Sequence, residues 1–301
     1  MLTPYRYLVK SYSCEILFYM AGLLNVIVVE IFVEDNMMSS RWMYYISSLP
    51  TLAFGVKSWW IMIAAFLGLP IKRPFVVALR NGLRFEARTG LDVWVIKESC
   101  LDRDYERESV PIQDGWVVID IGAGLGDFAI HAARQTPKGR VYAYEPAPNS
   151  FHLLQRNIIR NHTPNVEIFP WAVNGTGESM ILDTGNGDPS LYRTTNIISE
   201  QRIGIVKVTG ITLNQIFESL QLTRCDFLKI DCEGGEYEML FQASDATLHK
   251  FRHVCLEYHE GVTMFTRHDL VHFFEQKGFV VRHTPNPVHQ ETGFLYAYHT
   301  D

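Results

Sequence analysis

The chain of 301 residues is predicted to adopt an α/β fold, because strand-like and helix-like segments alternate from Trp116 to the end of the sequence. One apolar strand-like run leads directly into a glycine turn at 122–126 and then into a helix. At the end of the chain, two strand-like segments, 279–282 and 294–299, follow each other without an intervening helix. These observations predict a Rossmann-like sheet of seven mostly parallel strands whose last strand is antiparallel.

The hydrophobic pattern and the turn residues place each expected element. Strands are expected at 116–122, 140–145, 166–173, 226–232 and 253–259. Helices are expected at 127–135, 149–161 (with Asn149 as its N-cap), 213–220, 236–243 and 267–277, the last capped by Gly278. Residues 180–209 are rich in glycine, proline and polar residues, so we expect an insertion or lid there. Either Arg193 or Tyr192 in this segment holds a polar substrate, or both are solvated loop residues.

Two features precede this domain. Asn81-Gly82 separates the strand-like runs 75–80 and 83–88, which predicts a β-hairpin. The composition changes at Pro70 to Pro74, and this change divides the chain into an apolar helical N-terminal extension, 1–70, and a main domain, 71–301.

The N-terminal extension contains two apolar runs, Ile16–Val33 and Trp59–Leu69. Both are short for a membrane-spanning helix, and Glu30 at the depth of a bilayer would cost a few kcal/mol. Helices that pack on protein are therefore favoured over a membrane anchor. Association with a membrane surface and formation of a homodimer both remain open.

Charge and cysteine content limit the class of partner. The formal net charge is −6 and the isoelectric point is about 6.0, so nucleic acid is not an expected partner. The five cysteines are widely spaced and odd in number, which favours reduced thiols and a cytoplasmic location.

The glycine turn is the first candidate binding element. Its glycines follow the pattern G-x-G-x-G after Asp120, and Asp127 stands where a dinucleotide-binding loop has its third glycine. Glu145 ends the next strand about twenty residues later, where an acidic residue hydrogen-bonds ribose hydroxyls. Pro146 then fixes the following turn. Asp120 is expected either to meet the cationic amino group of a ligand or to bond the turn's own amides.

Two further strand ends carry candidate catalytic residues. Asp231, Glu233 and Glu236 form an acidic group after one strand, and His259 ends the next strand. Asp231 or His259 is the expected base that removes a hydroxyl proton, His259 because its ordinary pKa is close to neutral. A metal site is one interpretation of the acidic group, but no metal is predicted, because no nearby histidine completes a convincing ligand set.

From about Phe75 to Tyr298 the chain resembles the FkbM family of S-adenosylmethionine-dependent methyltransferases. The resemblance rests on four segments: V-I-D-I-G-A-G at 118–124, Y-E-P at 144–146, K-I-D-C-E-G-G-E at 229–236 and L-E-Y-H at 256–259. It implies O-methylation of a hydroxyl on a sugar, a polyketide or a related small molecule. Asn214 departs from the aspartate that is usual there, and the first seventy residues lie outside the resemblance.

The expected site is therefore a set of cofactor contacts and a base. The cofactor-binding residues for S-adenosylmethionine would be Asp120, Gly122, Ala123, Gly124, Gly126, Glu145, Pro146 and Asp231, and the catalytic residues His259 and Asp231. Two other classes compete with this interpretation. One is an NAD-dependent oxidoreductase, and the other is a membrane-tethered scaffold with a methyltransferase fold and no activity.

Overall fold

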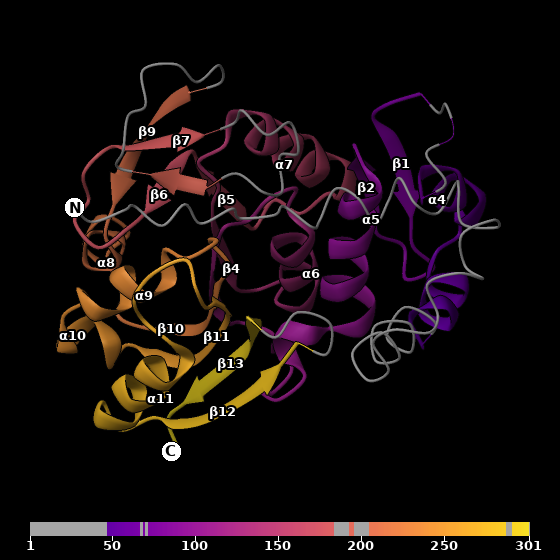
Figure 1. Ribbon diagram of the computed structural model, residues 1–301. Coiled ribbons are helices and arrows are strands. Elements are labelled where there is room, and N and C mark those ends of the chain that lie inside the picture. The colour runs from indigo at the N-terminus through magenta and orange to yellow at the C-terminus, as the bar shows by residue number, and fades with distance from the viewer. Residues whose placement is uncertain are drawn as a thin grey trace, which may run out of the picture.

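The computed structural model describes residues 47–66, 69, 72–183, 193–195, 205–286 and 291–300. Seven strands form the central sheet in the order β12-β13-β11-β10-β3-β4-β5 (Figure 1). Their bounds are β3 (Val117–Ile121), β4 (Arg140–Tyr144), β5 (Val166–Phe169), β10 (Cys225–Ile230), β11 (Phe251–His259), β12 (Val280–Pro285) and β13 (Thr292–Tyr298). The pairs from β5 to β11 are parallel, whereas β13 is antiparallel to both of its neighbours. The predicted seven-stranded sheet with an antiparallel last strand is confirmed.

Helices cover both faces of the sheet, because successive side chains of each strand point to opposite faces. On β3, Val118 packs with α6 (Asp127–Gln135) and α7 (Pro148–Asn161), whereas Ile119 packs on the opposite face. That opposite face is covered by α8 (Leu213–Ser219), α9 (Glu236–Phe241) and α11 (Arg267–Gln276). The short helix α10 (Asp245–Leu248) precedes β11.

A second sheet of four strands, in the order β6-β9-β7-β8, corrects two expectations. The segment expected as one strand at 166–173 divides into β5 and β6 (Trp171–Val173), and β6 pairs with β9 (Ile205–Ile211) instead of with β4. The segment 180–209, expected as an insertion or lid, contains β7 (Met180–Asp183), β8 (Arg193–Thr195) and the start of β9. Leu182 and Val208 are buried in a small core of this sheet, so the segment is not only a loop. Tyr192 lies outside the described residues.

The described part of the N-terminal extension packs on the predicted hairpin. The hairpin forms as β1 (Phe75–Ala78) and β2 (Arg84–Ala87), which pair antiparallel. Residues 47–55 and α4 (Trp59–Phe66) are helical, and Leu52, Val56 and Met62 are buried in one apolar cluster with hairpin side chains. Within the described residues, no helix combines the length and the apolar character that crossing a bilayer requires. The run Ile16–Val33 lies outside these residues, and the boundary near residue 70 stays a prediction.

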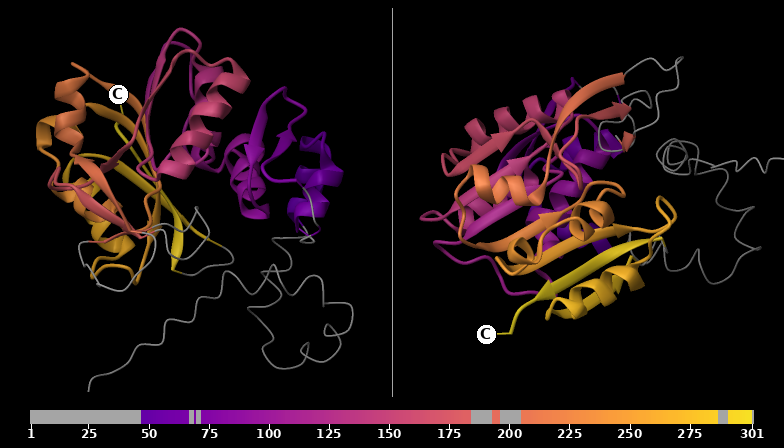
Figure 2. Two further views of the ribbon diagram at one scale, coloured as in Figure 1. Left: turned by 90° about the horizontal axis from the view of Figure 1, so that it is seen from above. Right: turned by 90° about the vertical axis from the view of Figure 1, so that its left-hand side faces the viewer.

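The hairpin lies beyond α6 and α7, on the side away from α9 and α11 (Figures 1 and 2). Asn157 and Asn161, one turn apart on α7, complete the hydrogen bonding of the outer edge of β2. The Asn157 amide pairs with the backbone of Glu86 at 2.7 and 3.2 Å, and the Asn161 amide pairs with the backbone of Arg84 at 2.9 and 2.7 Å. Asn157 Nδ2 also donates to the carbonyl of Leu125, at 2.9 Å. One buried asparagine therefore joins the hairpin to the glycine turn.

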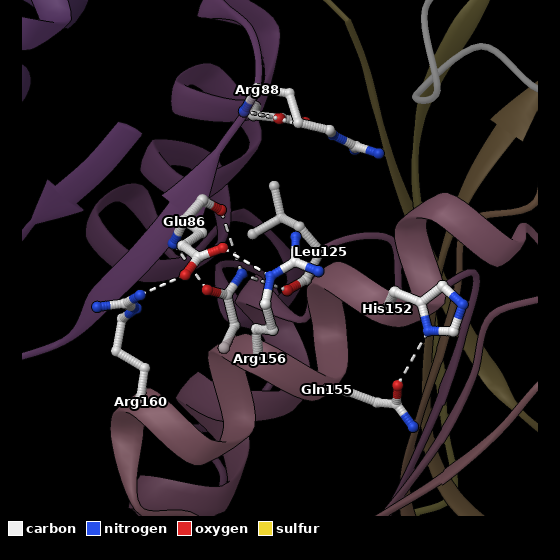
Figure 3. A network of polar contacts seen from close by, with 9 residues as sticks. Glu86, Arg88, Leu125, His152, Gln155, Arg156 and Arg160 are labelled. Carbon is white, nitrogen blue, oxygen red and sulfur yellow. Dashed lines mark hydrogen bonds and ion pairs between the residues drawn. The ribbon is translucent and has the colours of Figure 1, made fainter. Parts of the chain in front are cut away.

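Ion pairs reinforce this attachment at the surface. The Glu86 carboxylate lies between the guanidinium groups of Arg156 and Arg160, both of them on α7 (Figure 3). The helix itself begins one residue earlier than expected. Pro148 is its first residue and Ala147 its N-cap, so the expectation of an Asn149 cap is wrong. Proline is favoured at the first helical position, because the N–H that it lacks would make no hydrogen bond within the helix there.

Candidate functional site

The carboxyl ends of β3, β4, β10 and β11 lie along one edge of the central sheet, because parallel neighbours end on the same side. We call this the carboxyl edge. Asp120 lies near the end of β3, and Glu145 directly follows β4. Asp231 follows β10, and His259 is the last residue of β11. The sequence-predicted residues therefore reach the same edge from four strands.

The glycine turn keeps its shape through close backbone contacts. The amides of Gly122 and Ala123 both donate to the carbonyl of Tyr144, at 3.0 Å each. Gly122 has a φ of 73°, and a Cβ there would lie 1.7 Å from the carbonyl oxygen of Asp231. Gly124 differs, because a Cβ at its position would meet no atom of the described residues within 4 Å. Gly126, with a φ of 91°, is the N-cap of α6.

Glu145 holds the turn after β3 together with the turn after its own strand. Its Oε2 accepts a hydrogen bond from the amide of Gly124, and its Oε1 accepts one from the amide of Ala147, each at 2.8 Å. Pro146 lies between these two contacts and is half-buried. Burial raises the pKa of Glu145 to about 7, although the two amides oppose the rise. The two backbone amides thus fix the position of the Glu145 carboxylate before any ligand binds.

Asp120 has a charged partner within the protein. It is completely buried, and Lys229 of β10 stands opposite it in the parallel register, with Nζ 3.2 Å from the Asp120 carboxylate. Lys229 Nζ also donates to the carbonyl of Gly122, at 2.8 Å. Burial alone would lower the pKa of Lys229, but Asp120 and Asp231 raise it above its ordinary value. Neither Asp120 oxygen accepts a hydrogen bond from the amides of the turn, so that expectation is wrong. Asp120 instead supports the turn through Lys229, and its contact with a ligand stays a prediction.

Asp231 is the more accessible acid of the carboxyl edge. Its side chain is 29% exposed, and its Oδ2 accepts a hydrogen bond from the Tyr105 hydroxyl at 2.8 Å. The Tyr105 ring packs edge-on against Phe128 and Phe294, which fixes the position of the hydroxyl. Tyr105 precedes Asp231 by 126 residues, so no short-range pattern in the sequence relates the two.

His259 is held by a buried glutamate. Glu236 is completely buried, and its Oε1 accepts from the backbone amide of His259 at 2.9 Å and lies 3.2 Å from Nδ1 of the ring. Burial favours the neutral ring, but the hydrogen bond to Glu236 and the surrounding carboxylates raise the pKa of His259 to about 10. The ring on its own is therefore protonated at neutral pH, and it must lose that proton before it can act as a base. Glu236 is thus both the first residue of α9 and the residue that holds His259 in place.

Glu257 completes a group that the sequence did not reveal. One ligand atom each from Asp231, Glu257 and His259 lie within 4.8 Å of one another. The argument that no histidine stands near the acidic residues is therefore wrong, because His259, far along the sequence, comes next to Asp231 through the pairing of β10 with β11. Burial and the nearby Asp231 raise the pKa of Glu257 well above its ordinary value. Glu257 and His259 are two residues apart on one strand, so their side chains leave the same face. This spacing is the sequence signal that could have predicted the group.

Comparison with known proteins assigns the family. Residues 120–281 match the model of the methyltransferase FkbM domain. The chain is 26% identical over 225 residues to the AMB antimetabolite synthetase AmbE of Pseudomonas aeruginosa, a match that covers 62% of this chain and 10% of AmbE. It is 25% identical over 198 residues to the 31-O-demethyl-FK506 methyltransferase FkbM of Streptomyces tacrolimicus, covering 56% of this chain and 74% of that protein. It is 24% identical over 194 residues to the hexuronic acid methyltransferase AglP of Haloferax volcanii, covering 64% and 77%.

The domain match includes the glycine turn, Glu145, Asp231 and His259, that is, the residues at all four strand ends. It decides against the NAD-dependent oxidoreductase that the sequence left as an alternative. The matched segment exceeds half of the chain, and the sheet order and antiparallel last strand agree with the predicted fold. The chain belongs to the family of methyltransferases with an FkbM domain.

Proposed function

We propose that this protein is an S-adenosylmethionine-dependent O-methyltransferase that acts on a hydroxyl group of a small molecule, a sugar being one class of acceptor. The observation that carries the proposal is the pair of hydrogen bonds by which Glu145 joins Gly124 and Ala147. It places a carboxylate against a glycine turn at the end of neighbouring parallel strands. This is the position at which open α/β sheets bind the ribose of a cofactor.

The residues of the turn fit such a ligand. Each Glu145 oxygen accepts one backbone amide and keeps a second lone pair, which is free to accept a ribose hydroxyl. The space beside Gly124 admits a ligand close to the backbone. The turn at 122–126 would hold the methionine part, and Asp120, held by Lys229, would set the electrostatic field behind it. Pro146 would fix the path of the chain beside the ribose.

The cofactor supplies an electrophilic methyl group on a sulfonium centre. The protein has to bring an acceptor oxygen into line with that methyl group and to take the hydroxyl proton as the new C–O bond forms and the C–S bond breaks. Asp231 and His259 lie at the ends of adjacent strands and are the two proposed bases. Tyr105 orients Asp231, and Glu236 orients His259.

The acceptor class is supported by two relatives whose names state it. One is named for a demethyl-FK506 substrate and the other for a hexuronic acid. The acidic net charge gives no footprint for nucleic acid. Arg193, at the start of β8, remains a candidate contact for a polar acceptor. We also propose a cytoplasmic location, with a homodimer and association with a membrane surface as the two alternatives for the N-terminal extension.

Calorimetry with S-adenosylhomocysteine and with NAD tests the cofactor. We expect binding of the first compound and not of the second. Replacement of Glu145 by alanine should weaken binding of S-adenosylhomocysteine by roughly tenfold or more, because an interaction with a charged hydrogen-bonding group contributes about 1.5–3 kcal/mol. The matched control is Glu167→Ala, an exposed carboxylate on the adjacent strand β5. Unchanged affinity in Glu145→Ala would remove the ribose assignment, and binding of neither compound would favour the scaffold alternative.

The base assignment needs turnover with an acceptor. Activity on a metabolite extract with a labelled methyl donor would identify that acceptor first. Alanine at His259 should then lower kcat by about 10²–10⁴-fold if the ring removes the proton. Full turnover in this variant would leave Asp231 as the proposed base.

A further inference from the structure

We propose that Asp231, Glu257 and His259 bind one divalent cation of the first transition row, of which Mn²⁺ is the representative. The protein contributes two carboxylates and one imidazole, whose ligand atoms lie within 4.8 Å of one another. Such a mixed set of oxygen and nitrogen ligands suits Mn²⁺, which accepts carboxylates readily and imidazole as well. Binding of the cation is independent of the proposed methyl transfer, but its part in the reaction rests on that proposal.

The strand pairing produces this ligand set. Glu257 and His259 are two residues apart on β11, so their side chains leave the same face of the sheet. Asp231 directly follows β10, the parallel neighbour of β11. The three ligands therefore come from two adjacent strand ends, which the core of the protein holds rigidly on both faces. Two carboxylates at this separation repel each other, and a cation between them would relieve the repulsion.

The orientation of His259 is a second and independent observation. Its side chain is 9% exposed, and its Nδ1 lies 3.2 Å from Glu236 Oε1. Nε2 makes no hydrogen bond to any residue that the structure describes, and the carboxylate oxygen nearest to it in an ion pair, Glu233 Oε2, is 3.9 Å away. Metal-binding histidines commonly donate the other ring N–H to a carboxylate, which fixes the tautomer and leaves the second nitrogen for the metal. Glu236 holds His259 in this way, and a cation would bind Nε2 in place of the proton that this nitrogen carries in the protonated ring.

Asp231 is oriented in a comparable manner. The Tyr105 hydroxyl donates to its Oδ2 at 2.8 Å, which leaves Oδ1 and the remaining lone pairs for a cation. Lys229 is the competing positive charge, with Nζ 3.8 Å from Asp231 Oδ2. That ammonium is already engaged by the Gly122 carbonyl at 2.8 Å and by Asp120 at 3.2 Å. It serves the glycine turn, and among the described residues no lysine or arginine forms an ion pair with Glu257.

A cation at this place would act on the acceptor. Three protein ligands leave coordination positions open for oxygen atoms of a substrate. A hydroxyl group that binds a divalent cation loses its proton more readily, and the cation also fixes the direction of its lone pair. With the cation bound, His259 would be a ligand and not the base, so the hydroxyl proton would pass to the carboxylate oxygen of Asp231 that does not hold the cation.

Electron paramagnetic resonance of Mn²⁺ titrated into the full-length protein tests the site without donor or acceptor. We expect one bound Mn²⁺ per chain, and at least tenfold weaker binding in Glu257→Gln and in His259→Gln, since even partners that only orient a ligand contribute 10–100-fold to metal affinity. The matched control is Glu238→Gln, an exposed carboxylate in the same segment of chain, which should bind as the parent protein does. No binding by the parent protein, or equal binding by the parent and Glu257→Gln, overturns the proposal.

Three more variants keep the outcome decisive. If Glu257→Gln does not fold, Asp231→Asn removes a ligand whose side chain is partly exposed, and it must lower Mn²⁺ affinity to the same extent. Tyr105→Phe should weaken Mn²⁺ binding roughly tenfold through the orientation of Asp231. Glu145→Ala should bind Mn²⁺ normally while it loses S-adenosylhomocysteine. Mn²⁺ binding without S-adenosylhomocysteine binding in the parent protein would retain the cation site and reject the proposed function.

Discussion

Gly124 and Glu145 are joined by a hydrogen bond of 2.8 Å from the Gly124 amide to Glu145 Oε2, across a sequence separation of 21 residues. The other carboxylate oxygen receives the amide of Ala147. A single side chain therefore holds the loop after β3 against the turn after β4. The expected ligand contact and the shape of the loop depend on the same two oxygens.

Replacement of Glu145 by glutamine should destabilise the protein by about 1–3 kcal/mol, because the new NH₂ group faces one of the two amide donors and leaves it without an acceptor. The Ala147 amide is buried and the Gly124 amide is partly buried. Urea unfolding followed by circular dichroism would measure the change. Glu167→Gln, at an exposed position of β5, should leave the free energy of unfolding unchanged within 0.5 kcal/mol, as is usual for surface positions. An unchanged midpoint in Glu145→Gln would contradict the double role of this carboxylate.

Two alanine substitutions in the glycine turn should have different effects. Gly122→Ala places a Cβ 1.7 Å from the carbonyl oxygen of Asp231, so the strands must separate and we expect severe destabilisation or failure to fold. Gly124→Ala meets no described atom and costs only the left-handed backbone at its φ of 53°, about 1–2 kcal/mol. The folded Gly124→Ala protein should nevertheless bind S-adenosylhomocysteine poorly, because the methyl group enters the ligand's space. Calorimetry and thermal unfolding of both variants would separate the two effects, and normal ligand binding by Gly124→Ala would count against the proposed position of the cofactor.

The residues at the strand ends could be predicted from the sequence. Because parallel neighbours end on the same side of a sheet, Glu145, Asp231 and His259 were expected along one edge. It did not allow their partners to be predicted. The pairing of Asp120 with Lys229 depends on the register between β3 and β10, which is set by packing of the whole core. The contact of Tyr105 with Asp231 is likewise a product of tertiary structure alone.

Several elements outside the central sheet could also not be predicted from the sequence. The second sheet was missed because β6, β7 and β8 have three or four residues each and lie in sequence that is otherwise rich in turns. The sequence analysis predicted neither the helix α5 (Gly90–Lys97) nor the short helical turns that follow it, Glu98–Asp102 and Asp104–Glu106. Thr89 caps α5 by accepting from the amide of Asp92, a local signal that could have located its start.

Acid should destabilise the protein through Glu106. Although burial opposes its charge, hydrogen bonds from His131, Arg103 and the amide of Ile112 lower the pKa of Glu106 to about 2, from an ordinary value of 4.5. A carboxylate whose pKa is lower in the folded state stabilises fully above the unfolded value and less as the pH falls towards the folded value. We therefore expect a loss of up to about 3 kcal/mol between pH 4.5 and pH 2, at about 1.4 kcal/mol for each pKa unit. Glu106→Gln, followed by chemical denaturation across this range, should show a flatter pH dependence, and an equal slope would exclude Glu106 as its source.

The buried pair of Asp120 and Lys229 should be strongly coupled. Lys229→Met leaves the carboxylate of Asp120 completely buried without the ammonium at 3.2 Å, and breaking a buried pair in this way costs about 3–5 kcal/mol. Adding Asp120→Asn to Lys229→Met removes the isolated charge, so the double variant should be more stable than the sum of the single changes implies, by about 1–3 kcal/mol. Lys207→Met, at an exposed position of β9, is the control for the loss of a lysine. Additive effects in this double-mutant cycle would mean that Lys229 stabilises the turn through the Gly122 carbonyl and Asp231 alone, and that the charge of Asp120 is compensated elsewhere.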